Sequence, residues 1–214
     1  VFAVLWIFLV TMLVGLPIHA LGYYPLVAWL IGKKSPKIYL GQGADAIMTG
    51  VSCNSSLAAV PVTLRCLDRM QVSPQSARLA ACVGTNLNND GITLYEAMAA
   101  LFLAQALGFD LSMGSQVLIV AGSMIAGPGV AGIPEAGMIV LPLVLSAAGL
   151  PPQVIGAAIP LIMTVDWIIA RARSGVNVLS DMLVAILLDV GRVTSAAETI
   201  ALQPQSEAAN STEP

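Results

Sequence analysis

Long apolar stretches separated by short polar breaks run along most of this chain. Residues 1–32 contain no Asp, Glu, Lys or Arg, and a helix needs only about 20 apolar residues to cross a bilayer. Residues 153–190 form a second long apolar stretch toward the C-terminus. The two stretches predict two helices that span a membrane.

The segment after the first stretch is interrupted by small and polar residues. It covers residues 38–64 and contains TGVSCNSSLAAVP, a poor centre for a continuous spanning helix. Basic residues flank it on both sides: Lys33, Lys34 and Lys37, then Arg65, Arg69 and Arg78. A segment that enters the bilayer and returns would keep all six on one side, as the positive-inside bias favours. The pattern predicts a re-entrant hairpin.

Two further segments are interrupted in the same way. Residues 79–109 are apolar except for TNLNNDGITLYE, and an Asp at membrane depth is tolerated only beside protein or a water-filled cavity. A helix broken at Asn88–Gly91 is therefore predicted. In residues 111–165, IAGPGVAGIPEAG separates two apolar arms of about 12–17 residues, which are short for a full crossing. These arms predict a second hairpin, entering from the opposite side.

Composition agrees with a membrane protein. Of the 214 residues, 57% are apolar and 10% are charged, whereas soluble domains average about 25% charged. The net charge of −3 and the few basic residues argue against a nucleic-acid partner. The three cysteines lack metal spacing, and GPGVAG matches a dinucleotide motif without the strand that such a site needs. No cofactor is expected. The polar residues 192–214 predict a disordered cytoplasmic tail.

The stretch DWIIARARSGVNVLSD, residues 166–181, brings charge back into an apolar region. On a helix with about 100° per residue, its polar groups and one alanine share a stripe roughly 100° wide. The members of this stripe are Asp166, Ala170, Arg173, Ser174, Asn177 and Asp181. Arg171 points elsewhere. Because a charge in lipid costs several kcal/mol, the stripe must face protein or a wet cavity. One interpretation is an internal ion pair of Arg173 with Asp166 or Asp181 that only joins helices.

The interrupted segments favour a binding site instead. Broken helices expose N-termini, which attract carboxylates, and unpaired carbonyls, which coordinate cations. Asn88, Asp90 and Asp181 supply oxygen ligands of the kind that Na⁺ uses, and Arg173 supplies a planar fork suited to a substrate carboxylate. An anionic substrate with compensating cations in one site predicts a secondary transporter.

The ordered set of these features resembles the dicarboxylate/amino acid:cation symporters, the glutamate transporter family. The resemblance covers nearly all of residues 1–190, in the order serine-tipped hairpin, Asn-x-Asp-Gly break, Gly/Pro hairpin and Arg…Asn…Asp helix. It implies an all-α membrane protein with transmembrane helices, two re-entrant hairpins and a broken helix. The implied segments are helix six (1–35), hairpin one (36–72), broken helix seven (76–108), hairpin two (112–150), helix eight (153–191) and the tail (192–214).

The resemblance also implies features beyond this chain. The sequence starts inside an apolar run without Met, so we expect it to be the C-terminal part of a longer protein whose first five helices carry the trimerisation scaffold. The whole would be a homotrimer, multi-pass in an inner or plasma membrane with a cytoplasmic C-terminus. Its transport domain would move across the lipid bilayer as a unit, in an elevator-type symport.

Site residues carry over by position. The resemblance implies contacts with a small anionic substrate for hairpin one, the break, hairpin two and helix eight: Asn54, Ser55, Ser56, Thr93, Gly132, Gly137, Arg173, Ser174 and Asn177. It implies a cation site formed by Gly84, Asn88, Asp90, Asn177 and Asp181.

Four positions depart from the family pattern. Asn89 replaces a methionine and Ile92 a threonine, so the coupling ion is left open between Na⁺ and H⁺. Glu135 stands where a glycine is usual. Ala170 replaces the aspartate that binds the α-amino group in amino-acid-transporting relatives, which favours a C4-dicarboxylate over an acidic amino acid. Two alternatives stay open: a sensor or channel-like relative, and a membrane enzyme with an aspartate pair, Asp90 and Asp181.

Overall fold

The computed structural model describes residues 2–129, 137–147 and 149–210, and every regular element in them is a helix. No strand occurs in these residues, so the all-α fold class predicted from the sequence is confirmed there. Residues Gly132 and Glu135 of the predicted second hairpin lie outside the described residues.

The N-terminal apolar stretch forms one long helical segment. It consists of α1 (Phe2–Pro17), a π-helix η1 (Ile18–Tyr23) and α2 (Tyr24–Leu30). The wider π-helical turn follows Pro17 directly, and the chain remains helical through it. Much of this segment is apolar on the outside, with Phe2 and Trp6 exposed by 89% and 66%. An apolar outer face of this extent is suited to lipid rather than to water.

Helices α3 (Pro36–Cys53) and α4 (Ser56–Arg69) form a helical hairpin. Asn54 ends α3 in the left-handed conformation, with φ of 52°, and the Ser55 hydroxyl caps α4 by accepting from the Ala58 N–H at 3.1 Å. At the open end, Lys34 Nζ donates to the Met70 carbonyl at 2.7 Å. The chain therefore enters and leaves this hairpin at the same end of the molecule.

The predicted broken helix is interrupted in the middle. α5 (Pro74–Arg78) continues as a π-helix η2 (Leu79–Val83) and a 3-10 turn η3 (Gly84–Asn86). Residues 87–89 are not helical, and α6 (Asp90–Ala106) begins at the aspartate. The interruption thus ends slightly earlier than the Asn88–Gly91 break that the sequence predicts, because Gly91 already belongs to α6.

Helices α7 (Met113–Ala126) and α8 (Gly137–Ala147) pack against each other and against α6. The short 3-10 turn η4 (Gly127–Gly129) follows α7. At 1.5 Å per residue, α7 and α8 are about 21 and 17 Å long, and both are shorter than the hydrocarbon core of about 30 Å. Neither helix could cross a bilayer alone.

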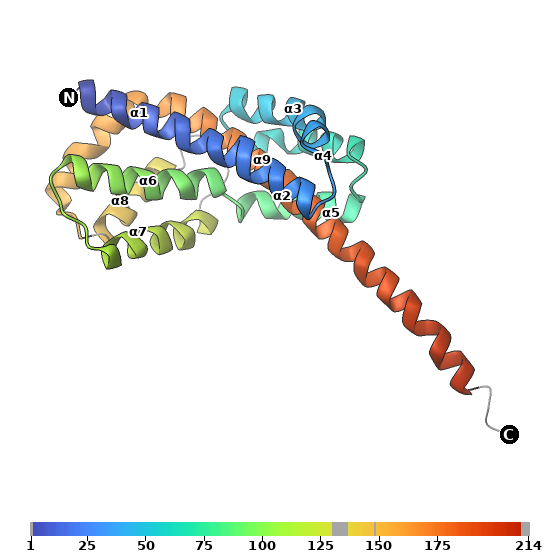
Figure 1. Cartoon of the computed structure of the whole chain (residues 1–214). Helices are drawn as coiled ribbons and strands as arrows, with labels where there is room; N and C mark the ends of the chain where they lie inside the picture. The colour runs from blue at the N-terminus through green and yellow to red at the C-terminus, as the bar shows by residue number, and fades with distance from the viewer. Residues whose placement is uncertain (1, 130–136, 148, 211–214) are drawn as a thin grey trace.

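The last helix, α9 (Pro152–Asn210), is the central element of the fold. It packs against α1 to α6 and α8. Figure 1 shows α6, α7 and α8 at one end of the bundle and α3, α4 and α5 at the other, with α9 running past both. The structure carries this helix to Asn210, whereas the sequence predicts a disordered tail from residue 192.

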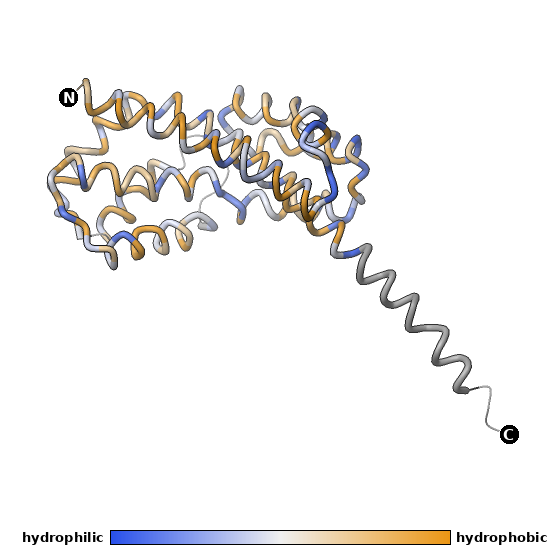
Figure 2. The backbone as a smooth tube through the Cα atoms, viewed as in Figure 1, coloured by the Kyte–Doolittle hydropathy of each residue, from blue (hydrophilic) through white to orange (hydrophobic). Residues whose placement is uncertain are grey.

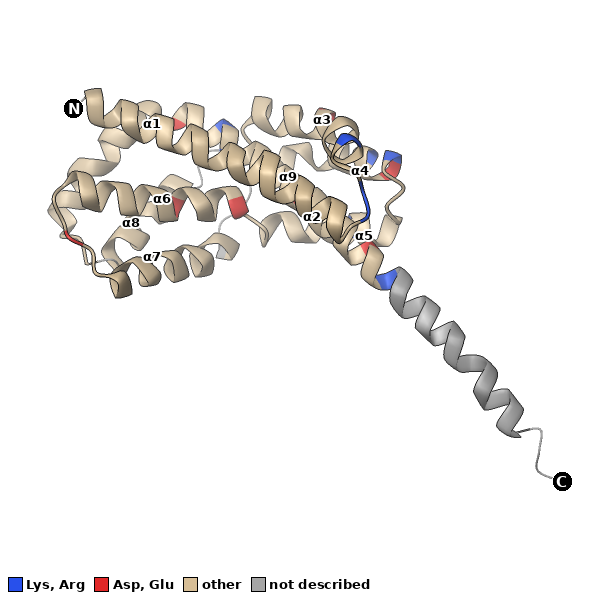
Figure 3. Cartoon of the chain, viewed as in Figure 1, with Lys and Arg blue, Asp and Glu red and all other residues tan. Residues whose placement is uncertain are grey.

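The outer surface agrees with a bilayer environment. Two helical segments, Phe2–Leu30 and Pro152–Arg192, are long and apolar enough to cross a membrane by length and composition. Large apolar side chains are exposed on α1, α7 and α8, and Figure 2 shows how much of these helices is apolar. Charged residues gather instead at the loop between α2 and α3 and at the nearby end of α4 (Figure 3). The basic end of the molecule is therefore shared by the first helical segment and the first hairpin.

Candidate functional site

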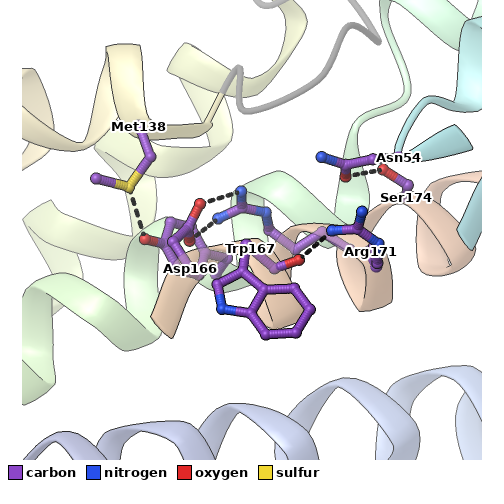
Figure 4. Close-up of polar contacts among 8 residues, drawn as sticks. Asn54, Met138, Asp166, Trp167, Arg171 and Ser174 are labelled. Carbon is purple, nitrogen blue, oxygen red and sulfur yellow. Dashed lines mark hydrogen bonds and ion pairs between the residues drawn. The ribbon is translucent and has the colours of Figure 1, made fainter. Parts of the chain in front are cut away.

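The polar stripe of α9 lies inside the protein. Its polar members and Ser180 are at most 8% exposed: Asp166, Arg173, Ser174, Asn177, Ser180 and Asp181. Ala170, on the same stripe, is also buried. Arg171 is set apart, as the helical wheel indicates. It donates to the Trp167 carbonyl at 2.8 Å, and its guanidinium lies 5.6 Å from the Trp167 ring centroid (Figure 4).

At one end of the stripe Arg173 forms a bidentate ion pair. Its two terminal nitrogens donate to the two oxygens of Asp166 at 2.9 and 3.0 Å, and the carboxylate is labelled in Figure 4. The guanidinium also lies 3.9 Å from the ring centroid of Tyr95. Of the two pairings considered from the sequence, the structure selects Asp166. The pair leaves three guanidinium N–H groups unused by Asp166.

Gly137, the first residue of α8, lies directly against this arginine. A Cβ at this position would come within 3.2 Å of Arg173 Cζ and Nη1. The N-terminus of α8 therefore approaches the guanidinium at a distance that a larger residue would disturb. Gly137 and Arg173 are both predicted substrate contacts, and the structure places them side by side.

The tip of the α3–α4 hairpin meets the middle of the stripe. Ser174 Oγ donates to Asn54 Oδ1 at 3.2 Å (Figure 4). Ser56, at the start of α4, is buried and accepts from the Thr85 hydroxyl at 3.4 Å, while Ser55 caps the same helix. The N-terminus of α4 thus lies beside α9 and the break.

The N-terminus of α6 is held by Asn177. The Gly91 N–H donates to Asn177 Oδ1 at 2.7 Å, and Asn177 Nδ2 donates to Asn89 Oδ1 at 3.4 Å. Any Cβ on Gly91 would collide with the Arg173 carbonyl, so this close approach requires glycine. Asn89 also donates to the Gly127 carbonyl at 3.2 Å. This asparagine therefore links the break to α9 and to the turn after α7.

At the far end of the stripe two carboxylates lie in one hydrogen-bonded network. Asn88 Nδ2 donates to Asp181 Oδ1 at 3.1 Å. Asp90 Oδ2 accepts from Ser180 at 2.8 Å and from the Tyr24 hydroxyl at 2.9 Å. Ser180 also lies 3.0 Å from Asn88 Oδ1. Asp90 and Asp181 are therefore linked through Asn88 and Ser180, with neutral donors as their partners.

Gly84 and Thr93 lie beside the predicted cation ligands rather than beside Arg173. The Gly84 carbonyl accepts from the N–H groups of Leu87 and Asn88, both at 2.7 Å. Both lone pairs are used, so this carbonyl would reach a cation only after the turn rearranges. Thr93 faces a separate cavity of about 420 Å³, which it lines together with His19, Tyr23 and Asp90. The structure does not bring Thr93 to Arg173, and Gly132 lies outside the described residues.

Sequence reasoning missed Glu96, Tyr24 and Ser180. Glu96 of α6 is fully buried, and neither of its carboxyl oxygens has a hydrogen-bond partner among the described residues. An acidic residue in an apolar segment was a usable signal for it. Tyr24 gave no such signal, because its partner lies 66 residues away in the sequence.

Simple metal-binding clusters do not explain this network. In the part of the chain that the structure describes, no three His, Cys, Asp or Glu side chains gather closely enough to hold a metal ion. A cation would have to use amide, hydroxyl or backbone oxygens beside the carboxylates, as Na⁺ readily does. The donor set around Asn88, Asp90 and Asp181 fits such an ion.

Helix N-termini aimed at a buried polar stripe, beside a helix interrupted at its middle, define the class of secondary transporter binding sites. Comparison with known proteins gives the family. Residues 1–190 match the model of the sodium:dicarboxylate symporter family, and the chain belongs to this family. It is 41% identical to mouse excitatory amino acid transporter 3 over 182 residues, and 39% identical to rat excitatory amino acid transporter 1 over 181 residues.

These alignments cover 85% and 84% of this chain but only 34% and 33% of the two relatives. The chain thus spans about a third of the length of the relatives it matches. Human excitatory amino acid transporter 3 is 38% identical over a similar range. Family membership confirms the predicted resemblance and makes the chain part of an integral membrane protein. The family is one of symporters, which rules against the enzyme alternative.

Proposed function

We propose that this chain forms the substrate- and cation-binding part of a symporter that moves an organic dicarboxylate together with Na⁺ or H⁺. The observation that carries the proposal is the meeting of α9 with three helix N-termini. Ser174 contacts the tip before α4, Asn177 binds the first turn of α6, and Arg173 lies against the first residue of α8. Helix N-termini attract anions.

Arg173 is the proposed anchor for a substrate carboxylate. Asp166 occupies one edge of the guanidinium, and the remaining N–H groups can bind a second carboxylate. The tip residues Asn54, Ser55 and Ser56 would bind the other end of the substrate, while Gly137 at the α8 N-terminus lies beside the anchor. The substrate would thus be an anion with two carboxylates rather than one.

Asn88, Asp90, Asn177 and Asp181 are the proposed cation ligands. Two carboxylates, buried Asp181 and partly buried Asp90, share a network whose hydrogen bonds among the described residues involve no basic side chain. A bound cation would offset this charge, and burying charges without compensation is costly. Symport follows if the cation and the anionic substrate stabilise the same arrangement of the break and α9.

Two features disagree on the substrate. The curated relatives are named as excitatory amino acid transporters, whereas Ala170 offers only a methyl group where an amine-binding aspartate would stand. Ala170 is buried on the stripe beside Arg173, within one helical turn. A methyl group cannot pair with an ammonium group, so we favour a C4-dicarboxylate such as succinate over aspartate.

Uptake by the complete protein tests the proposal. Labelled succinate or aspartate would be added outside proteoliposomes that hold the full-length transporter. Uptake would be measured with and without a Na⁺ or H⁺ gradient. We expect gradient-driven succinate uptake, and Ala170→Asp should raise aspartate uptake relative to succinate by about tenfold or more. Ala170→Asn controls for size without charge. Absence of uptake of both substrates under every gradient would refute the symporter.

The membrane arrangement is part of the same proposal. Both hairpins would be re-entrant, the α7–α8 hairpin would cover the substrate, and the bundle would move as one body in a homotrimer held by the preceding helices. The basic end shared by α2 and the α3–α4 hairpin supports a cytoplasmic position for that end and for the C-terminus. Labelling of Lys33→Cys from each side of sealed vesicles would check this orientation.

A channel-like or sensor relative is the second candidate. It is favoured by the full bidentate pairing of Arg173 with Asp166, which neutralises the proposed anchor without a substrate. Anion currents that persist without substrate flux would support this candidate. Currents that require both substrate and cation would support the symporter.

A further inference from the structure

Two hydroxyl groups outside the proposed ligand set donate to the same oxygen of Asp90. Tyr24 donates to Asp90 Oδ2 at 2.9 Å and Ser180 donates to it at 2.8 Å. Tyr24 is only 1% exposed and comes from α2, whereas Ser180 comes from α9. Asp90 is thus clamped between the first and last long helices by neutral O–H donors.

Ser180 cannot serve both of its acceptors at once. Its hydroxyl lies 3.0 Å from Asn88 Oδ1 and 2.8 Å from Asp90 Oδ2, but a serine has a single O–H proton. Whenever Ser180 donates to Asn88, Tyr24 is the remaining hydroxyl donor to Asp90 Oδ2. The phenol ring is packed in the core, so its hydroxyl is held in place by the fold.

We infer that Tyr24 sets the affinity of the Asp90 cation site, because its hydroxyl stands in for the cation when the site is empty. This inference rests on the proposed function. An O–H donor places partial positive charge on the carboxylate oxygen, where a bound cation would place a full charge. A cation that binds Oδ2 must displace this donor, so the hydrogen bond stabilises the cation-free protein and weakens cation binding.

The position of Tyr24 adds a mechanical consequence. Its hydroxyl connects the first turn of α6 to the segment that follows the π-helix η1. Binding of a cation would release this connection, and loss of the cation would restore it. Occupancy of the Asp90 site is thereby linked to how firmly α2 is held against the break.

Thermal unfolding of the full-length protein in detergent tests the inference without any substrate. The melting temperature would be measured as NaCl replaces choline chloride at constant ionic strength and pH. Variants are Tyr24→Phe and Ser180→Ala, which each remove one donor to Asp90. Tyr39→Phe is the matched control: Tyr39 is also fully buried, but its hydroxyl donates at 2.6 Å to the Leu179 carbonyl.

Tyr24→Phe should lower the melting temperature without Na⁺, and the deficit should shrink as Na⁺ is added. The Na⁺ concentration for half-maximal stabilisation should fall by about five- to tenfold, since a hydrogen bond to a charged group no longer competes. Ser180→Ala should lower the half-maximal Na⁺ concentration too, but by less. If Tyr24→Phe does not fold, Ser180→Ala replaces it in the test. Tyr39→Phe should show a deficit that Na⁺ leaves unchanged.

Asp90→Asn separates the role of Tyr24 from the existence of the cation site. If wild type responds to Na⁺, Asp90→Asn does not, and both hydroxyl variants respond as wild type does, the role of Tyr24 is refuted while the cation site stands. A weaker Na⁺ response in Tyr24→Phe would also overturn the inference, because it would make the phenol a ligand. If wild type and Asp90→Asn respond equally, the proposed cation site and the inference both fail.

Discussion

The two ends of the α9 stripe carry similar groups in opposite electrostatic balance. At the Arg173 end, one carboxylate and one guanidinium neutralise each other through two hydrogen bonds. At the Asp181 end, Asp90 and Asp181 have amide and hydroxyl donors as partners. The first end sums to zero charge and the second to two negative charges when its carboxylates are ionised.

This difference assigns separate tasks to the two ends. A neutral ion pair with unused guanidinium donors can accept an added anion without being left unpaired when the anion departs. A pair of carboxylates without a basic partner favours an added cation. One helix can therefore bind a substrate anion and a coupling cation side by side, with Asn177 between them.

Breaking the neutral end should have the largest effect. Arg173→Gln leaves Asp166 buried without its cationic partner and should lower the free energy of unfolding by about 3–5 kcal/mol. Asp166→Asn strands the guanidinium and should cost a similar amount. Chemical unfolding in mixed micelles would measure both variants.

The double variant Asp166→Asn/Arg173→Gln is the control for this prediction. It removes both charges together and should recover most of the lost stability, while substrate binding stays absent because the anchor is gone. Losses that simply add in the double variant would show that the two side chains act independently, against the bidentate pairing.

The charged end should respond in the opposite direction. Asp181→Asn removes one of two like charges from a partly buried network and should raise the stability of the Na⁺-free protein by about 1–2 kcal/mol. It should also abolish the rise in melting temperature with Na⁺. Asp110→Asn, on an exposed loop, makes the same chemical change outside the site and should alter neither quantity. A loss of Na⁺-free stability in Asp181→Asn would contradict the charge assignment.

The sequence alone predicts which residues of α9 form the polar stripe. The helical period placed Asp166, Arg173, Asn177 and Asp181 on one face, and the structure buries all four. Local spacing suffices for this, because one helix carries every member. It also indicated that Arg171 would point away, as it does.

Contacts between distant segments were beyond such reasoning. Tyr24 reaches Asp90 because α2 and α6 both pack on α9, and Tyr95 lies over Arg173 because α6 packs on α9. The choice of Asp166 over Asp181 as the partner of Arg173 is local instead, because helical side chains tilt toward the helix N-terminus, where Asp166 lies. For Gly84, the family pattern suggested a free carbonyl, but the tight turn to Asn88 uses it.

The protonation state of Glu96 decides whether the Arg173 end of the stripe is neutral. Replacing Glu96 has the smallest expected effect. This carboxyl is fully buried near enough to Arg173 to feel its charge, so an ionised Glu96 would give the neutral end a net negative charge. Because its oxygens have no hydrogen-bond partner among the described residues, we expect it to be protonated. Glu96→Gln, which has nearly the same shape, should then change the free energy of unfolding by less than about 0.5 kcal/mol.

Infrared spectroscopy supplies an independent readout for Glu96. A protonated carboxyl in apolar surroundings has a carbonyl stretching band that an amide lacks, so Glu96→Gln should lose this band while Asp110→Asn keeps it. If Glu96 were ionised, wild type and Glu96→Gln would show the same carbonyl stretching bands of protonated carboxyls. An ionised Glu96 would also compete with Asp166 for Arg173. Asp166→Asn would then lower the free energy of unfolding by far less than about 3–5 kcal/mol. Agreement of both measurements would leave Asp166 as the sole charge partner of Arg173 and keep the excess negative charge at the Asp181 end.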